Sequence, residues 1–164
     1  MINWMKAKKK DKTQDLIQVL APCDGTVLPL GESQDEMFRS GLLGHGCFIY
    51  PKSKKIFAPV SGVVKSAFPT GHALGIVSEE GVELLLHFGI DTVNLNGRFM
   101  HTTVSAGDLI EAGDKLAEID FPMIKKAGYA PDVYVIILNS ESYQIKIREQ
   151  DCESGQTVMT LARK

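Results

Sequence analysis

Residues 71–91 read GHALGIVSEEGVELLLHFGID, and this stretch decides how its part of the chain folds. Two apolar runs flank the polar residues SEEG (78–81), a pattern that is typical of a β-hairpin. A turn of even length centred between Glu79 and Glu80 predicts that His72 faces His87 across the two strands. Directly opposed side chains in an antiparallel pair have Cβ atoms about 4.5–5.5 Å apart, so the two imidazoles should lie side by side.

The same register pairs Val77 with Val82 and Leu74 with Leu85. It places Leu74 and Leu85 on the histidine face, where they would form exposed apolar surface of the kind that binds a partner, unless another layer of the fold covers them. A turn of odd length would shift the register by one residue and send the two histidines to opposite faces. The predicted histidine pair therefore depends on the turn.

The 164 residues suit one domain, with 44% apolar and 23% charged residues. The net charge of −2 gives no sign of nucleic-acid binding. Cys23, Cys47 and Cys152 are scattered, without a Cys-x-x-Cys spacing, and favour reduced cytosolic thiols. No apolar run is long enough to cross a membrane, and the N-terminus lacks the features of a signal peptide.

Residues 1–16 are rich in lysine and are predicted to form a flexible tail ahead of a domain at residues 17–164. The alternative is a short basic anchor in which Trp4 and Met5 make weak contact with anionic lipid.

From Ile17 onward, short apolar runs alternate with Gly, Pro, Asp and Asn, which indicates an all-β fold, an antiparallel sandwich or barrel. Two short helices are expected, Asp35–Gly41, which ends at a glycine, and Asp120–Ala127, which has Asp120 as a candidate N-cap and is followed by Gly128. The expected strands are Ile17–Ala21, Thr26–Pro29, Cys47–Tyr50, Lys55–Ala58, Gly62–Phe68, His72–Val77, Val82–Phe88, Leu109–Ile110, Lys115–Ile119, Val133–Leu138, Gln144–Ile147 and Val158–Leu161.

The sequence also contains an internal repeat. The pattern Ala-Pro-x-x-Gly-x-Val occurs at residues 21–27 and again at residues 58–64, an offset of 37. It describes a strand, a tight turn and a second strand, so duplicated β units are expected to pack face to face.

Two neutral imidazoles on one hairpin support three interpretations. In the first, one ring accepts a phosphoryl group while the other donates a hydrogen bond to it. In the second, the pair binds zinc, for which two nitrogens are an incomplete ligand set. In the third, the two rings only pack against each other. Thr70 lies two residues before His72, Gly89 two residues after His87, and Asp91 four residues after His87. These polar and small neighbours favour a functional site over simple packing.

These residues resemble the glucose-family enzyme IIA of the bacterial phosphoenolpyruvate:sugar phosphotransferase system, from Ile17 to the C-terminus. The family fold is an antiparallel β-sandwich with a duplicated motif, as expected from the repeat. The resemblance rests on the runs LAPCDGTV (20–27), FAPVSG (57–62), FPTGHA (68–73) and VELLLHFGIDTV (82–93), continued by Asn96-Gly97 and Val104-x-x-Gly107-Asp108.

The resemblance implies a phosphotransferase component that acts in sugar uptake. His87 would accept a phosphoryl group at Nε2 from the phosphocarrier protein HPr and pass it to a cysteine on the IIB domain of a sugar permease. His72 would hydrogen-bond the phosphate, and Thr70 would belong to the same network. The protein would be cytoplasmic and act at the inner face of the membrane through its permease partner.

The resemblance also implies docking residues. Asp35 and Asp91 would flank the site and meet basic residues of HPr, while Phe38 and Phe68 would form an exposed aromatic rim together with the two leucines. No cofactor is required, but some family members bind zinc through the two histidines, with a partner's carboxylate completing the site.

The chain departs from the family pattern at several positions. Leu74 and Leu85 replace phenylalanines that are common in the family, and Phe99 replaces a glycine, with Met100 following it. His45 lies in a loop where Asp or Lys is commoner. These changes leave the two histidines intact and bear on which partners fit.

Three alternatives compete with a phosphoryl carrier. A regulator could use the same face only for docking in its dephosphorylated state. A zinc endopeptidase of the family that cleaves peptidoglycan shares the motif His-x-Gly-x-Asp, but it also needs a His-x-His pair, which this sequence lacks. A biotinyl or lipoyl carrier needs a lysine in Met-Lys-Met or Asp-Lys-Ala, and neither tripeptide occurs.

Overall fold

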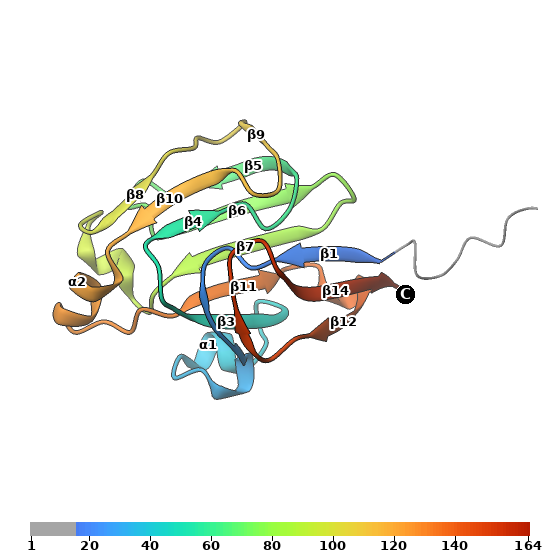
Figure 1. The fold of residues 1–164 in the computed structure, drawn as a ribbon, viewed down its shortest axis with the longest axis horizontal. Coiled ribbons are helices and arrows are strands. Elements are labelled where there is room, and N and C mark those ends of the chain that lie inside the picture. Colours follow the sequence, from blue (N-terminus) through green and yellow to red (C-terminus); the bar gives the residue numbers. More distant parts are fainter. Residues whose placement is uncertain (1–15) are drawn as a thin grey trace, which may run out of the picture.

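The computed structural model describes residues 16–164, which form β-strands joined by turns and short helices (Figure 1). The tail expected over residues 1–16 lies outside the described residues except for Leu16, which is exposed just before the first strand. Within residues 16–164, no helix has the length and apolar character needed to cross a membrane.

Eight strands form the main sheet, in the order β13-β2-β3-β11-β7-β6-β5-β9. Every strand pair is antiparallel. The bounds are β2 Gly25–Pro29, β3 His45–Pro51, β5 Gly62–Ala67, β6 Ala73–Ser78, β7 Glu83–Phe88, β9 Leu109–Ile110, β11 Val133–Ile137 and β13 Asp151–Cys152.

Two three-stranded sheets pack against the main sheet, in the orders β1-β14-β12 and β4-β10-β8. One contiguous core joins side chains from all three sheets, among them Val19, Leu84 and Leu116. The predicted antiparallel β-sandwich is confirmed, because its layers share that core. The bounds are β1 Ile17–Leu20, β14 Thr157–Arg163, β12 Tyr143–Ile147, β4 Lys55–Phe57, β10 Lys115–Ile119 and β8 Met100–Thr102.

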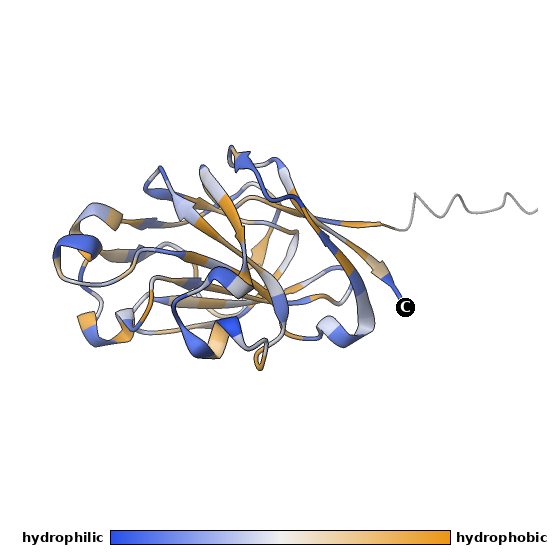
Figure 2. Cartoon of the chain, turned by 90° about the horizontal axis from the view of Figure 1, so that it is seen from below, coloured by the Kyte–Doolittle hydropathy of each residue, from blue (hydrophilic) through white to orange (hydrophobic). Residues whose placement is uncertain are grey.

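Every strand expected from the sequence occurs, and β8 and β13 are additional. Figure 2 shows hydrophobic residues concentrated in the strands, while many of the connections are hydrophilic. The three cysteines are buried and unpaired, in agreement with the expected free thiols.

Both expected helices form, although each is shorter than predicted. Asp35 caps α1 (Glu36–Arg39) by accepting the Met37 N–H at 2.8 Å, and Asp120 caps α2 (Phe121–Lys126) by accepting the Met123 N–H at 3.2 Å. Among residues 16–164, three 3₁₀ turns are also present: η2 Leu30–Glu32, η3 Thr92–Leu95 and η4 Ser140–Ser142.

The two copies of the repeat correspond to β1–β2 and β4–β5. The Leu20 N–H donates to the Pro59 carbonyl at 2.9 Å, and the Phe57 N–H donates to the Pro22 carbonyl at 2.8 Å. Leu20 and Phe57 are equivalent in the repeat, as are Pro22 and Pro59, so the copies exchange equivalent hydrogen bonds. This symmetric contact places β2 and β5 toward opposite ends of the main sheet.

The predicted register of the β6–β7 hairpin is wrong by one residue. Ala73, not His72, lies opposite His87, and Leu74 lies opposite Leu86. The turn has three residues rather than two or four: the Ser78 N–H donates to the Val82 carbonyl at 2.9 Å. The third turn residue, Gly81, has φ +91°, a conformation that glycine adopts without strain.

The shifted register places Leu74 on the core face, where it is fully buried among Leu84 and other residues of the main core. The expectation that Leu74 belongs to an exposed rim is therefore wrong. The shift does not send His72 to the opposite face from His87, because His72 lies in the loop before β6. Its side-chain direction is set by that loop, in which Gly71 has φ +70°, and not by strand alternation.

Candidate functional site

His87 lies near the end of β7, in the middle of the main sheet between β11 and β6. Its Nδ1 lies 2.8 Å from the Gly89 carbonyl oxygen. A carbonyl can only accept, so Nδ1 carries the proton in the neutral ring and Nε2 keeps a free lone pair. The backbone bend at Gly89, with φ +77°, brings that carbonyl under the ring. His87 is thus oriented with its nucleophilic nitrogen available.

His72 approaches the same place from the loop between β5 and β6. The ring centroids of His72 and His87 are 5.4 Å apart, and the rings meet at 77°. The Thr70 hydroxyl forms a short hydrogen bond with His72 Nδ1. The structure therefore brings together Thr70, His72 and His87, the three residues singled out from the sequence, although by a different route from the predicted one.

Burial controls the charge of both rings. Removal from water, and to a lesser extent the neighbouring His72, lower the pKa of His87 to about 4, against the opposing effects of the Gly89 hydrogen bond, Asp35 and Asp91. Burial also lowers the pKa of His72. Both imidazoles are therefore neutral at pH 7.

Behind His87 lies an aromatic layer on the outer face of the main sheet. The Phe38 ring contacts His87 edge-on with centroids 5.1 Å apart, and it stacks on Tyr134 at 3.8 Å with 11° between the ring planes. Phe38 is 4% exposed, so its expected place in an exposed rim is wrong. The physical reason is Tyr134, whose flat face draws Phe38 inward and buries it.

The other two residues expected in the exposed rim, Phe68 and Leu85, differ in exposure. Phe68 is 42% exposed, with its ring 5.2 Å from that of His72, while Leu85 is half-buried against the cluster that contains Phe38. Sequence reasoning missed two more exposed apolar residues, Met37 in α1 and Val93 in η3. Met37 neighbours Phe38, and Val93 lies two residues after Asp91. A large apolar residue next to a predicted site residue is the signal that would have found them.

The negative charges of Asp35 and Asp91 each raise the pKa of His87, so both carboxylates act on the site electrostatically. Asp35 is half-buried as the cap of α1, and Asp91 is exposed in the left-handed conformation, with φ +59°. His45 on β3 and His101 on β8 are exposed on other elements. Only His72 and His87 pair with each other among the histidines of the described residues.

The arrangement of His72 and His87 can be compared with the zinc site that the sequence suggested. Within residues 16–164, no group of three His, Cys, Asp or Glu side chains is placed to hold a metal ion. Two imidazoles 5.4 Å apart fit two corners of a zinc tetrahedron and leave the other corners to groups from outside the chain.

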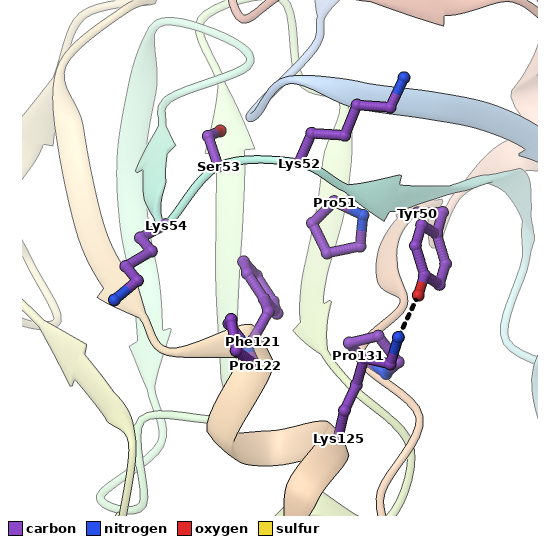
Figure 3. Close-up of a pocket in the computed structure, with 9 residues that line it drawn as sticks. All are labelled: Tyr50, Pro51, Lys52, Ser53, Lys54, Phe121, Pro122, Lys125 and Pro131. Atoms are coloured by element: carbon purple, nitrogen blue, oxygen red, sulfur yellow. Dashed lines mark hydrogen bonds between the residues drawn. The ribbon is translucent and has the colours of Figure 1, made fainter.

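A hollow of about 440 Å³ lies elsewhere, between the end of β3 and α2 (Figure 3). Lys52, Lys54 and Lys125 surround it, Phe121 lies beside it, and Lys125 Nζ donates to the Tyr50 hydroxyl at 2.7 Å. No histidine lines this hollow. The only described place that combines a nucleophilic nitrogen with a second imidazole is therefore the face at His72 and His87.

Comparison with known proteins identifies the family of this chain. Residues 17–143 match the family described as phosphoenolpyruvate-dependent sugar phosphotransferase system, EIIA 1. The glucose-specific EIIA component of Mycoplasma capricolum is 48% identical over 88% of this chain and 95% of its own length. The structure of glucose permease IIA from that organism has a TM-score of 0.85 at 39% identity, covering 88% of this chain and 95% of that one.

Larger proteins also contain a region similar to this chain. The β-glucoside-specific EIIBCA component of Halalkalibacterium halodurans is 41% identical over 96% of the chain, and that of Dickeya chrysanthemi is 44% identical over 77%. The chain spans about a quarter of the length of the first of these relatives and a fifth of the second.

Proposed function

Since the chain belongs to the EIIA family of the phosphoenolpyruvate-dependent sugar phosphotransferase system, whose members are phosphotransferase components, we propose that His87 is its phosphoryl acceptor. The single observation that carries this assignment is the hydrogen bond from His87 Nδ1 to the Gly89 carbonyl. It fixes the tautomer in which Nε2 is the nucleophile. His72 has no such carbonyl, because its Nδ1 is bonded to the Thr70 hydroxyl.

In the loading step, His87 Nε2 attacks the phosphorus of phospho-HPr. The bond from Nε2 to phosphorus forms as the bond from phosphorus to the donor histidine breaks, and the electron pair of that bond returns to the donor ring. Nδ1 of His87 keeps its proton, and the Gly89 carbonyl stabilises the positive charge that develops on the ring. Positioning accounts for most of this catalysis, because phosphoryl transfer asks little covalent chemistry of the protein.

His72 is the donor that holds the transferred group. With the Thr70 hydroxyl donating to Nδ1, Nε2 of His72 carries the proton and faces the phosphoryl oxygens. In the onward step, a cysteine thiolate of the IIB domain attacks phosphorus, and His87 leaves as a neutral ring. A neutral His72 supports the phosphoryl group without fully neutralising it, which keeps the group transferable.

Docking on this face accounts for partner choice. Phe68 and Leu85 supply apolar surface, while Asp35 and Asp91 supply negative charge for a basic donor such as HPr. The acceptor is the IIB domain of a sugar permease, in line with the fused EIIBCA relatives. We place the EIIA unit at residues 17–164, working in the cytoplasm at the inner face of the membrane.

A zinc ion bound to this histidine pair would bridge the chain to a partner protein. His72 and His87 would supply two nitrogens, and a carboxylate from a partner would supply a third ligand. Because Nε2 of His87 cannot bind both phosphorus and zinc, phosphorylation would release the metal. Calorimetric titration of zinc into wild type, His87→Ala and phosphorylated protein tests this, and equal affinity in all three would contradict it.

Incubation with enzyme I, HPr and labelled phosphoenolpyruvate, followed by mapping of the modified residue, tests the central proposal. Label is expected on His87, and label on His45, His72 or His101 would overturn the assignment. A folded wild-type chain that takes up no label would favour the alternative function, a docking regulator that uses the dephosphorylated face.

A further inference from the structure

A buried tyrosine lies directly beside the acceptor histidine. Tyr134 on β11 is the cross-strand partner of His87 on β7, and the two ring centroids are 6.3 Å apart. Directly opposed residues of an antiparallel pair project from the same face of the sheet. Tyr134 nevertheless has no exposed surface, because Phe38 of α1 stacks on its ring and Ser33, just before α1, lies at its hydroxyl.

The tyrosine hydroxyl is joined to this covering segment by one hydrogen bond. The Tyr134 hydroxyl lies 2.7 Å from Ser33 Oγ, and Ser33 is 2% exposed. Ser33 Oγ also accepts the Asp35 N–H at 3.1 Å, and the Ser33 carbonyl accepts from Arg39 at 3.3 Å. Burial raises the pKa of Tyr134 to about 12, so its hydroxyl stays protonated. Ser33 therefore ties the start and the end of the α1 segment to β11.

The ring of Tyr134 makes the second connection. Phe38 lies flat on it at 3.8 Å, and the edge of Phe38 rests against His87 at 5.1 Å. The chain of contacts runs from Ser33 through Tyr134 and Phe38 to His87. It closes one side of the His87 ring, while the Gly89 carbonyl fixes its Nδ1. A ring held on two sides has less freedom to turn away from an incoming phosphorus.

We propose that Tyr134 is a positioning residue for phosphoryl transfer: by bonding Ser33 and stacking on Phe38, it latches residues 33–39 against His87 and keeps water from that side of the ring. This inference rests on the function proposed above for His87. Tyr134 itself touches neither the phosphoryl group nor the partner.

The test breaks the hydrogen bond between Tyr134 and Ser33 by changing either partner. Tyr134→Phe keeps the stacked ring and loses only the hydroxyl. Ser33→Ala loses the same hydrogen bond from the other side, together with the one from the Asp35 N–H. Tyr50→Phe is the matched control, because Tyr50 lies on β3 of the same sheet and its hydroxyl bonds Lys125. The double variant Ser33→Ala/Tyr134→Phe measures the coupling, since two changes that break one bond should not add.

Two quantities are measured for each variant. The first is the pKa of His87 from its NMR titration, which needs no phosphoryl donor. The groups that act on that pKa, His72, Asp35 and Asp91, are unchanged in all variants. Hydration of the ring should move the His87 pKa upward by about one unit toward the ordinary value. The second is the single-turnover rate of phosphoryl transfer from phospho-HPr, which should fall about tenfold at saturating donor.

Support requires that both quantities move in Tyr134→Phe and Ser33→Ala, and that both stay at the wild-type value in Tyr50→Phe. Wild-type values in folded Tyr134→Phe and Ser33→Ala would overturn the latch. A slower rate with an unchanged His87 pKa would also overturn it, since the His87 ring would then be no more hydrated than in the wild type. If the wild type accepts no phosphoryl group, the proposed function fails, and the pKa alone still decides whether the latch exists.

Discussion

The two histidines reach one site from two kinds of backbone. His87 lies in a strand with a paired strand on each side, so its position follows from the sheet. His72 lies in a loop one residue before β6, and its position follows from Gly71 and from the Thr70 hydroxyl. A rigid strand suits the atom that must form and break a bond, while a loop suits a donor that adjusts to the phosphoryl group as it arrives and leaves.

Replacing each histidine by glutamine should give the largest difference between the two positions. His87→Gln should abolish phosphate acceptance, because the nucleophile is gone. His72→Gln should still accept, but should pass the group on about 10²- to 10³-fold more slowly, the range typical of a lost hydrogen-bond donor to transition-state charge. Uptake of label from phosphoenolpyruvate measures the first step, and transfer to a IIB domain measures the second. Equal loss in both steps for His72→Gln would remove the distinction.

The two positions also differ in what they contribute to stability as pH changes. The folded pKa of His87 is about 4, below the value of about 6.5 for an exposed histidine. Between these values the unfolded chain binds more protons than the folded one, so the stability that neutral His87 provides above pH 6.5 is lost as pH falls through 4. The loss should reach about 3 kcal/mol.

Denaturant unfolding at several pH values measures this slope. His87→Gln should flatten the slope between pH 6.5 and 4, since glutamine does not titrate. His72→Gln should flatten it less, because His72 is less buried. The same pH dependence in wild type and His87→Gln would show that other groups cause it.

A third comparison separates the loop that carries His72 from the turn that closes the hairpin. Gly71 and Gly81 both have positive φ, so alanine at either should cost about 1–2 kcal/mol. A Cβ on Gly71 would lie 3.2 Å from the Met100 carbonyl oxygen, whereas a Cβ on Gly81 would meet nothing within 4 Å. Gly71→Ala should therefore also displace His72 and slow onward transfer severalfold.

Gly81→Ala is the matched control, with similar loss of stability in urea but normal transfer to a IIB domain. Similar transfer rates in the two variants, with Gly71→Ala at the wild-type level, would mean that the loop conformation does not position His72.

The contrast between strand and loop also explains what could be predicted from the sequence. The strands, the two short helices, the Asp120 cap and the repeat follow from local patterns, and all of them appear in the structure. The number of residues in the 79–81 turn does not follow from such a pattern, and one residue of error was enough to misplace Leu74. The histidine pair was correctly expected, but through a register that the structure lacks.

Long-range contacts account for the other failures. Phe38 is buried because Tyr134, far away in the sequence, offers it a flat surface. Phe99 adopts φ +71°, a conformation that glycine takes without strain but that is strained for a residue with a side chain. Neither burial nor backbone strain of this kind leaves a periodic signal in the chain.

The smallest predicted effect concerns docking at the strand end. Asp91 is exposed after β7 with φ +59°, and asparagine tolerates that conformation, so Asp91→Asn changes the charge alone. Association with phospho-HPr should slow about two- to fivefold at low salt, and less at high salt, because screening weakens interactions between exposed charges. Glu79→Gln removes the same charge at the far end of the hairpin and should have no effect. Stopped-flow association rates over a range of salt concentrations measure both. If the two variants slow association equally, net charge and not the position of Asp91 guides the donor to His87.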